Sequence, residues 1–63
     1  MKTQLAAIIE RERSGYVSIC PELDIVSQGA TIEEARENLR QAVELFFEAA
    51  SESEVQTRLR EGV

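Results

Sequence analysis

TIEEARENLRQAVELFFEAA, residues Thr31–Ala50, is the stretch that decides the fold, because no other long segment of the chain is periodic. Its apolar side chains recur at three- and four-residue steps and form one stripe of a helix. Thr31 and Glu34 have the spacing of a capping box, which predicts that the helix begins there. An amphipathic helix needs an apolar surface to lie on. The stripe consists of Ile32, Ala35, Leu39, Ala42, Val43, Phe46 and Ala50.

Three short runs before this helix predict the sheet that it covers. The segment Gln4–Glu10 can begin a helix, but the turn signal Ser14-Gly15 and the β-rich run behind it favour a strand. Tyr16–Cys20 and Ile25–Gln28 are the second and third strands. The sequence therefore predicts an α+β fold in the order β-β-β-α, a three-stranded antiparallel sheet with the long helix packed on one face.

The chain divides at the end of the long helix. We expect residues 1–50 to form the β-β-β-α domain and residues 51–63 to form a short C-terminal helix or tail. Ser51 or Ser53 can cap that second helix. Its apolar face holds little besides Val55 and Leu59, so we expect it to be loosely attached or to pack on another subunit.

Size and charge restrict the class of protein. A chain of 63 residues has a marginal core, and a single cysteine forms no internal disulfide, so self-association is expected to supply stability. The net charge of −5 disfavours direct binding of nucleic acid, which depends on Lys and Arg. The sequence has no signal peptide and no apolar run of membrane-spanning length, so we expect a cytoplasmic protein without membrane contact.

The residue types disfavour catalysis. The chain has no histidine, and Cys20 has no clear base beside it in the sequence. Glu10 and Glu12 alternate with arginines, which is typical of a solvated strand end rather than a metal site. The glycines lack the spacing of a phosphate loop. We therefore expect no enzyme, no catalytic residue, no metal and no cofactor; a ribonuclease-H-like nuclease is the least favoured alternative.

With catalysis and direct nucleic-acid binding disfavoured, we expect the protein to act through an interaction surface. The outer face of the long helix is acidic, and a basic partner can dock there. The sheet face or edge away from the helix can pair subunits. Tyr16 is a further candidate contact, although packing on the sheet is its more common role. The candidate partner-binding residues are Glu33, Glu37, Glu44, Glu48 and Tyr16.

Three motifs in order resemble one known family. They are GYVSICPEL at Gly15–Leu23, SQGATIEEA at Ser27–Ala35, and the Asn38–Leu45 part of the helix. The chain in this respect resembles the HicB antitoxin family. The resemblance implies a small α+β domain, described as partial ribonuclease-H-like, that binds a HicA toxin. Such a toxin is a small basic ribonuclease, so the expected function is neutralisation in a type II toxin–antitoxin system.

The chain departs from the family pattern in places. Many relatives carry a C-terminal DNA-binding domain, which we do not expect in a chain that stops at Val63, so operon repression is not carried over. Ala30 stands where an acidic residue is frequent, and Asp24-Ile25-Val26 stands where Pro-Gly-Cys is frequent. An orphan homo-oligomeric domain without a cognate toxin is the alternative interpretation.

Overall fold

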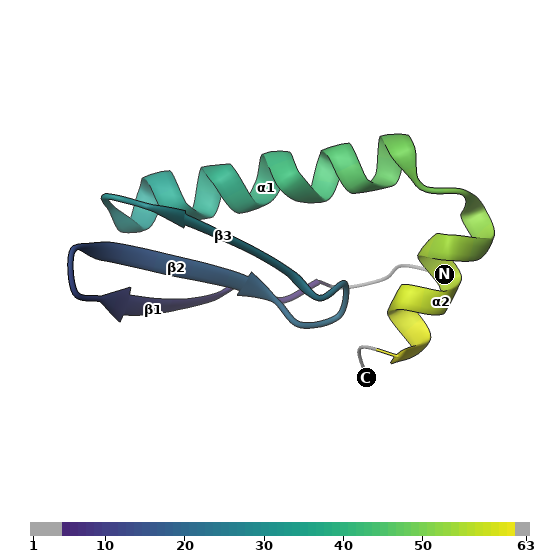
Figure 1. The fold of residues 1–63 in the computed structure, drawn as a ribbon, viewed down its shortest axis with the longest axis horizontal. Helices are drawn as coiled ribbons and strands as arrows, with labels where there is room; N and C mark the ends of the chain where they lie inside the picture. The colour runs from purple at the N-terminus through teal and green to yellow at the C-terminus, as the bar shows by residue number, and fades with distance from the viewer. Residues whose placement is uncertain (1–4, 62–63) are drawn as a thin grey trace.

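The computed structural model describes residues 5–61 and shows a three-stranded sheet followed by two helices (Figure 1). The strands are β1 (Ile8–Glu12), β2 (Gly15–Cys20) and β3 (Ile25–Gly29). The helices are α1 (Ile32–Ala49) and α2 (Glu52–Glu61). The predicted α+β fold is confirmed, with the long helix lying along one face of the sheet and a short helix after it.

The sheet is a meander in the order β1-β2-β3, with both pairs antiparallel. β1 begins at Ile8 and ends at Glu12, so it lies later than the predicted segment Gln4–Glu10, whose first residue is outside the described residues. The pairing of Glu12 with Gly15 explains this, because the hairpin turn leaves only Arg13 and Ser14 between the strands. The charged side chains of β1 are tolerated because β1 is an edge strand.

The long helix begins and ends as its sequence predicts. Thr31 is its N-cap, and its hydroxyl oxygen accepts a hydrogen bond from the Glu34 backbone N–H at 3.0 Å. The Glu34 carboxylate in turn accepts from the backbone N–H of Ala30, at 3.3 Å. At the other end the chain becomes extended at Ala50, whose N–H donates to the Phe46 carbonyl. The expected range Thr31–Ala50 is therefore helix α1 with its two caps.

The core lies between α1 and strands β2 and β3. Its buried apolar residues are Ala35 and Leu39 of the helix, Cys20 of β2, and Leu23 in the loop after β2. Val43 and Phe46 pack against this cluster and are partly buried. Ile32 departs from the predicted stripe, because it lies in the first helical turn at the end of the sheet and stays 45% exposed.

The loop between β2 and β3 contributes the largest fully buried side chain of the core. Leu23 is fully buried, and its backbone N–H donates to the Cys20 carbonyl at 3.3 Å. Asp24 follows with a φ of 56°, a left-handed conformation that Asp tolerates better than most residues. The tight turn therefore directs Leu23 inward and returns the chain into β3.

Helix α2 contacts the core and the loop after β2 through two side chains. Ser51 caps it, since its Oγ accepts the Glu54 backbone N–H at 3.1 Å. Leu59 packs on the core cluster, and Arg58 donates to the Leu23 carbonyl at 2.8 Å. The Arg58 guanidinium also lies 5.5 Å from the centroid of the Phe46 ring. Arg58, whose long side chain reaches the loop after β2, and Leu59 make these contacts; that α2 is loosely attached or packs on another subunit stays a prediction.

Candidate functional site

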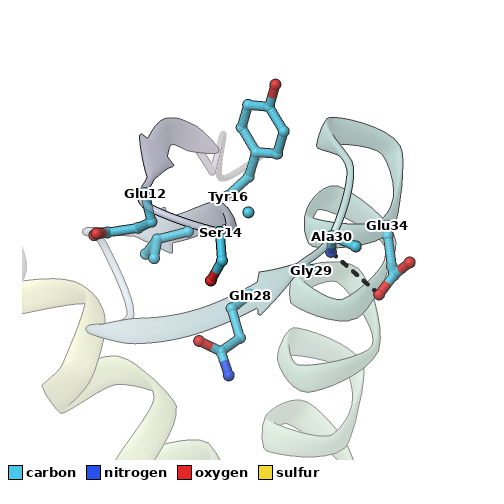
Figure 2. A pocket seen from close by; sticks show the side chains of 9 residues that line it. Glu12, Ser14, Tyr16, Gln28, Gly29, Ala30 and Glu34 are labelled. Carbon is cyan, nitrogen blue, oxygen red and sulfur yellow. Dashed lines mark hydrogen bonds between the residues drawn. The ribbon is translucent and has the colours of Figure 1, made fainter.

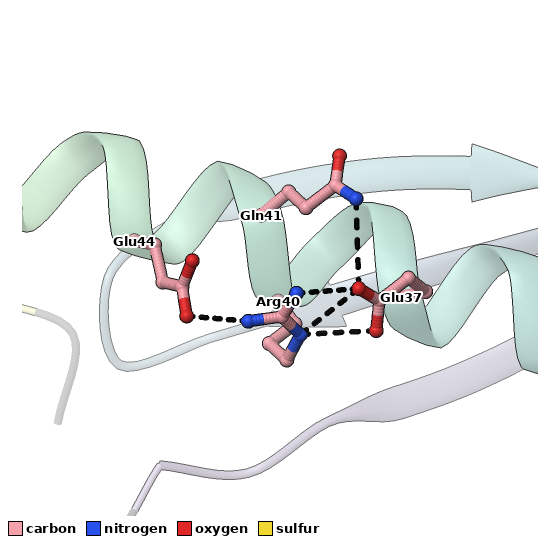
Figure 3. A network of polar contacts seen from close by, with 4 residues as sticks. All are labelled: Glu37, Arg40, Gln41 and Glu44. Carbon is pink, nitrogen blue, oxygen red and sulfur yellow. Dashed lines mark hydrogen bonds and ion pairs between the residues drawn. The ribbon is translucent and has the colours of Figure 1, made fainter.

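The acidic side chains predicted on the outer face of α1 are all exposed there. Glu37 and Glu44 lie one turn before and after Arg40, which pairs with both (Figure 3). The Arg40 Nε lies 2.9 Å and 3.1 Å from the two carboxylate oxygens of Glu37. The hydrogen bonds from Arg40 lower the pKa of the Glu37 carboxyl, and Glu37 and Glu44 together raise the pKa of the guanidinium.

Arg40 divides the acidic face into a paired centre and two unpaired ends. Within residues 5–61, the side chains of Glu33 and Glu48 make neither a hydrogen bond nor an ion pair. They are fifteen positions apart, which corresponds to roughly 22 Å along the axis of a helix. The face defined by Glu33, Glu37, Glu44 and Glu48 is therefore a long anionic strip with one cation at its middle.

Tyr16 lies at the other end of the sheet from Leu23, opposite Gly29 of β3. It borders a cavity of about 390 Å³ where the β1–β2 turn, the end of β3 and the start of α1 meet (Figure 2). A second hollow joins Tyr16 to Ile32 and Glu33. Of the predicted partner-binding residues, the structure thus brings Tyr16 and Glu33 together and leaves Glu48 near the far end of α1. The side chains around the larger cavity are those of Glu12, Ser14, Tyr16, Val17, Gln28, Ala30 and Glu34.

Two glycines shape this cavity by close approach. A Cβ at Gly15 would lie 2.6 Å from the Gly29 carbonyl oxygen. A Cβ at Gly29 would lie 2.5 Å from the backbone nitrogen of Ala35. The sequence shows these residues only as turn signals, whereas the structure shows that they let β3 contact both β2 and the first turn of α1.

A second, apolar cleft was not predicted from the sequence. It has a volume of about 250 Å³ and lies between the segment Leu5–Ala7 and α1, with Cys20, Leu39 and Val43 among its walls. One wall is tied to the loop after β2, because the Glu22 carboxylate accepts the backbone N–H of Ala6 at 3.0 Å. That hydrogen bond lowers the pKa of the Glu22 carboxyl.

Cys20 is buried beside this cleft and is a free thiol. Its Sγ lies 3.6 Å from the Glu22 carboxylate. Burial raises the pKa of the thiol above its ordinary value of 9.0, with the Glu22 charge adding to the effect. The thiol therefore stays protonated near neutral pH, where a nucleophilic cysteine needs to be ionised.

Among residues 5–61, no group of three or more Asp, Glu or Cys side chains is arranged to hold a metal ion. Glu10 and Glu12 lie on the sheet face away from α1, in the edge strand. In the same part of the chain, neither helix combines the length and the apolar character that crossing a membrane requires.

These features define a small α+β protein in which an antiparallel three-stranded sheet carries one long helix. The chain belongs to the UPF0150 family. It is 48% identical over 50 residues to a UPF0150 protein of Synechocystis sp., an alignment that covers 76% of this chain and 69% of that relative. It is 44% identical over 42 residues to a UPF0150 protein of Helicobacter pylori (strain J99), covering 65% of this chain and 58% of the relative.

The names of these relatives state no activity, substrate or partner. No protein-family profile matches the chain. No solved structure matches it either.

Proposed function

We propose that this UPF0150 protein is a non-catalytic binding module of a type II toxin–antitoxin system. It neutralises a small basic ribonuclease of the HicA type by covering the surface with which that enzyme binds RNA. The observation that carries this proposal is the anionic strip on α1, in a chain of net charge −5 without histidine. The resemblance of the three sequence motifs to HicB antitoxins supports the choice of partner.

The strip suits a basic partner because its carboxylates extend along most of the helix. An RNA-binding surface presents several Lys and Arg side chains in place of phosphate partners. Glu33 and Glu48, which have no partner within residues 5–61, are available for such cations without breaking an existing ion pair. Charge complementarity of this kind accelerates encounter, by roughly 10-fold to 1,000-fold, and disfavours acidic partners.

Two exposed apolar side chains supply anchors next to these charges. Leu45 is 63% exposed and Phe47 is 43% exposed, and their helical spacing places them on the two flanks of the strip. Large apolar side chains enclosed by charged residues are typical of interface centres, where aromatic residues contribute most of the binding energy. The outer side of α1 thus combines steering charges with apolar contacts.

The test is an RNA-cleavage assay with a HicA-type ribonuclease and an excess of this chain. The wild-type chain is expected to abolish cleavage and to co-purify with the enzyme. The double variant Glu33→Lys/Glu48→Lys is expected to lose inhibition, because it places cations against a basic surface. The matched control Glu10→Lys/Glu12→Lys makes the same change in net charge on the opposite side of the sheet and is expected to inhibit. Undiminished cleavage with the wild-type chain in excess contradicts the proposal.

A homo-oligomeric domain without a cognate toxin is the second candidate. The observation that favours it is the apolar face of the sheet that α1 leaves uncovered, with Val26 60% exposed. A chain that assembles with itself but leaves the ribonuclease fully active would support this candidate over the first.

A further inference from the structure

The sheet face away from α1 carries a row of β-branched apolar side chains. Ser18 and Cys20 of β2 are buried beneath α1, so the alternation of the strand places Val17 and Ile19 on the other side. The strand register aligns Ile8 and Val26 with Ile19. We call Ile8, Val17, Ile19 and Val26 the open face. It is richer in β-branched apolar residues than the covered face.

The open face is exposed in the single chain. Val26 is 60% exposed, Ile8 is 45% exposed, and Val17 and Ile19 are partly exposed. The row Ile8–Ile19–Val26 crosses all three strands without a charged residue. Isolated apolar residues at a protein surface are common, but a contiguous row on one face of a sheet marks an interaction site.

Pairing through the face is better supported than pairing through a strand edge. On β3, the Asn38 side chain of α1 donates to the Gln28 carbonyl at 2.7 Å, so the helix occupies part of that edge. On β1, the edge strand carries the charged run Glu10-Arg11-Glu12, a pattern that disfavours the addition of another strand. The row Ile8–Ile19–Val26 of the open face has neither obstacle.

The small core of the chain favours a second copy as the occupant of the open face. A domain of 63 residues buries little apolar surface of its own. Within residues 5–61, its buried apolar residues are Cys20, Leu23, Ala35 and Leu39. Packing one open face against an identical one adds apolar contact that the single chain lacks.

We infer that two copies of this chain stack through their open faces about a two-fold axis. Such an interface is self-complementary, because each apolar row packs on the same row of the partner. Glu10 and Glu12 lie on the same side of the sheet, with Glu10 directly opposite Val17. An axis near the row Ile8–Ile19–Val26 makes the strands of the two copies antiparallel and places the carboxylates of the two copies on opposite sides of the axis, apart from one another.

This assembly is independent of the proposed toxin binding. The open face and the anionic strip on α1 lie on opposite sides of the molecule, separated by the sheet and the core (Figure 1). A dimer formed in this way presents two α1 helices outward. Loss of self-association therefore does not by itself remove the anionic strip.

The test is sedimentation equilibrium of the full chain over a series of concentrations. The wild type is expected to be a dimer of twice 7.1 kDa. The variant Val26→Lys is expected to raise the dissociation constant by roughly 100-fold or more, because the two-fold axis places two unpaired ammonium groups in one interface. Leu45→Lys, the same kind of change at a residue 63% exposed on α1, is the matched control and is expected to leave the dimer intact.

Circular dichroism establishes that each variant is folded. The change Val26→Thr keeps the branched shape of the side chain and adds one hydroxyl, so it repeats the test with less risk to the strand, and about a 10-fold weaker association is expected from it. A wild-type chain that stays monomeric throughout the concentration series overturns the inference. Equal association of Val26→Lys and wild type overturns it as well.

Discussion

The face of the sheet that α1 covers and the open face differ in the side chains that the same strands present. Beneath α1 the sheet presents small residues, and the helix comes close enough for the Ser18 hydroxyl to donate to the Ala35 carbonyl at 2.7 Å. Gly29 permits the same close approach, since a Cβ there would meet the Ala35 backbone nitrogen at 2.5 Å. The open face instead carries larger β-branched side chains. The first face is fitted to its own helix, and the second is suited to another molecule.

The largest effect is expected at the covered face. Leu39→Asp places a carboxylate where the side chain is now 4% exposed, among Cys20 and Leu23. An unpaired buried charge costs several kcal/mol, which is a large share of the stability of any small domain. We expect the variant to lose its cooperative unfolding transition in circular dichroism. A melting temperature like that of the wild type would show that α1 does not pack on the sheet through Leu39.

A smaller effect is expected where the covered face makes its buried hydrogen bond. Ser18 is fully buried, and Ser18→Ala removes the donor to the Ala35 carbonyl, so a loss of about 1 kcal/mol in the free energy of unfolding is expected. The control is Ser27→Ala, the cross-strand neighbour on the same face, which is partly exposed and is expected to change stability by about 0.5 kcal/mol or less. Urea titration measures both. Equal losses in the two variants would contradict a specific role for the Ser18 hydrogen bond.

The pH dependence of stability is expected to be smaller still. The pKa of Glu22 is lowered in the folded chain, first by the backbone N–H of Ala6, and that of Glu37 is lowered by Arg40. Near pH 4.5, the ordinary pKa of a glutamate carboxyl, the unfolded chain therefore binds more protons than the folded chain does. Stability is fully present above that value and declines as the pH falls through the lowered pKa values. Urea midpoints measured at falling pH should decrease, and Glu22→Gln should flatten the decrease. An unchanged pH slope in Glu22→Gln would count against the Ala6 contact.

Local patterns predicted the elements better than the contacts between them. The periodicity and capping box of residues 31–50 predicted α1 to within a residue at each end, because both are properties of one continuous segment. The burial of Leu23 was not predicted, since no period marks a single apolar residue in a loop after a proline. Leu23 packs with Cys20 and Leu39, and Arg58 of α2 donates to its carbonyl from 35 residues away, so these contacts join segments that are distant in the sequence.

For the candidate surfaces too, features of one segment were predicted and features assembled from several segments were not. The acidic residues of α1 were predicted on its outer face, and the structure places them there. The pairing of Arg40 with Glu37 and Glu44 was available from their three- and four-residue spacing but was not used. The cavity beside Tyr16 was not predictable, because it is assembled from the β1–β2 turn, the end of β3 and the start of α1.

The contrast between the two faces is tested most directly by the concentration dependence of the thermal unfolding midpoint. If the open face is covered by a second copy, the folded dimer is stabilised by mass action and the midpoint rises with protein concentration. The wild type is expected to show this rise. Val26→Lys is expected to unfold at one temperature at every concentration. A wild-type midpoint that does not change with concentration would contradict the account.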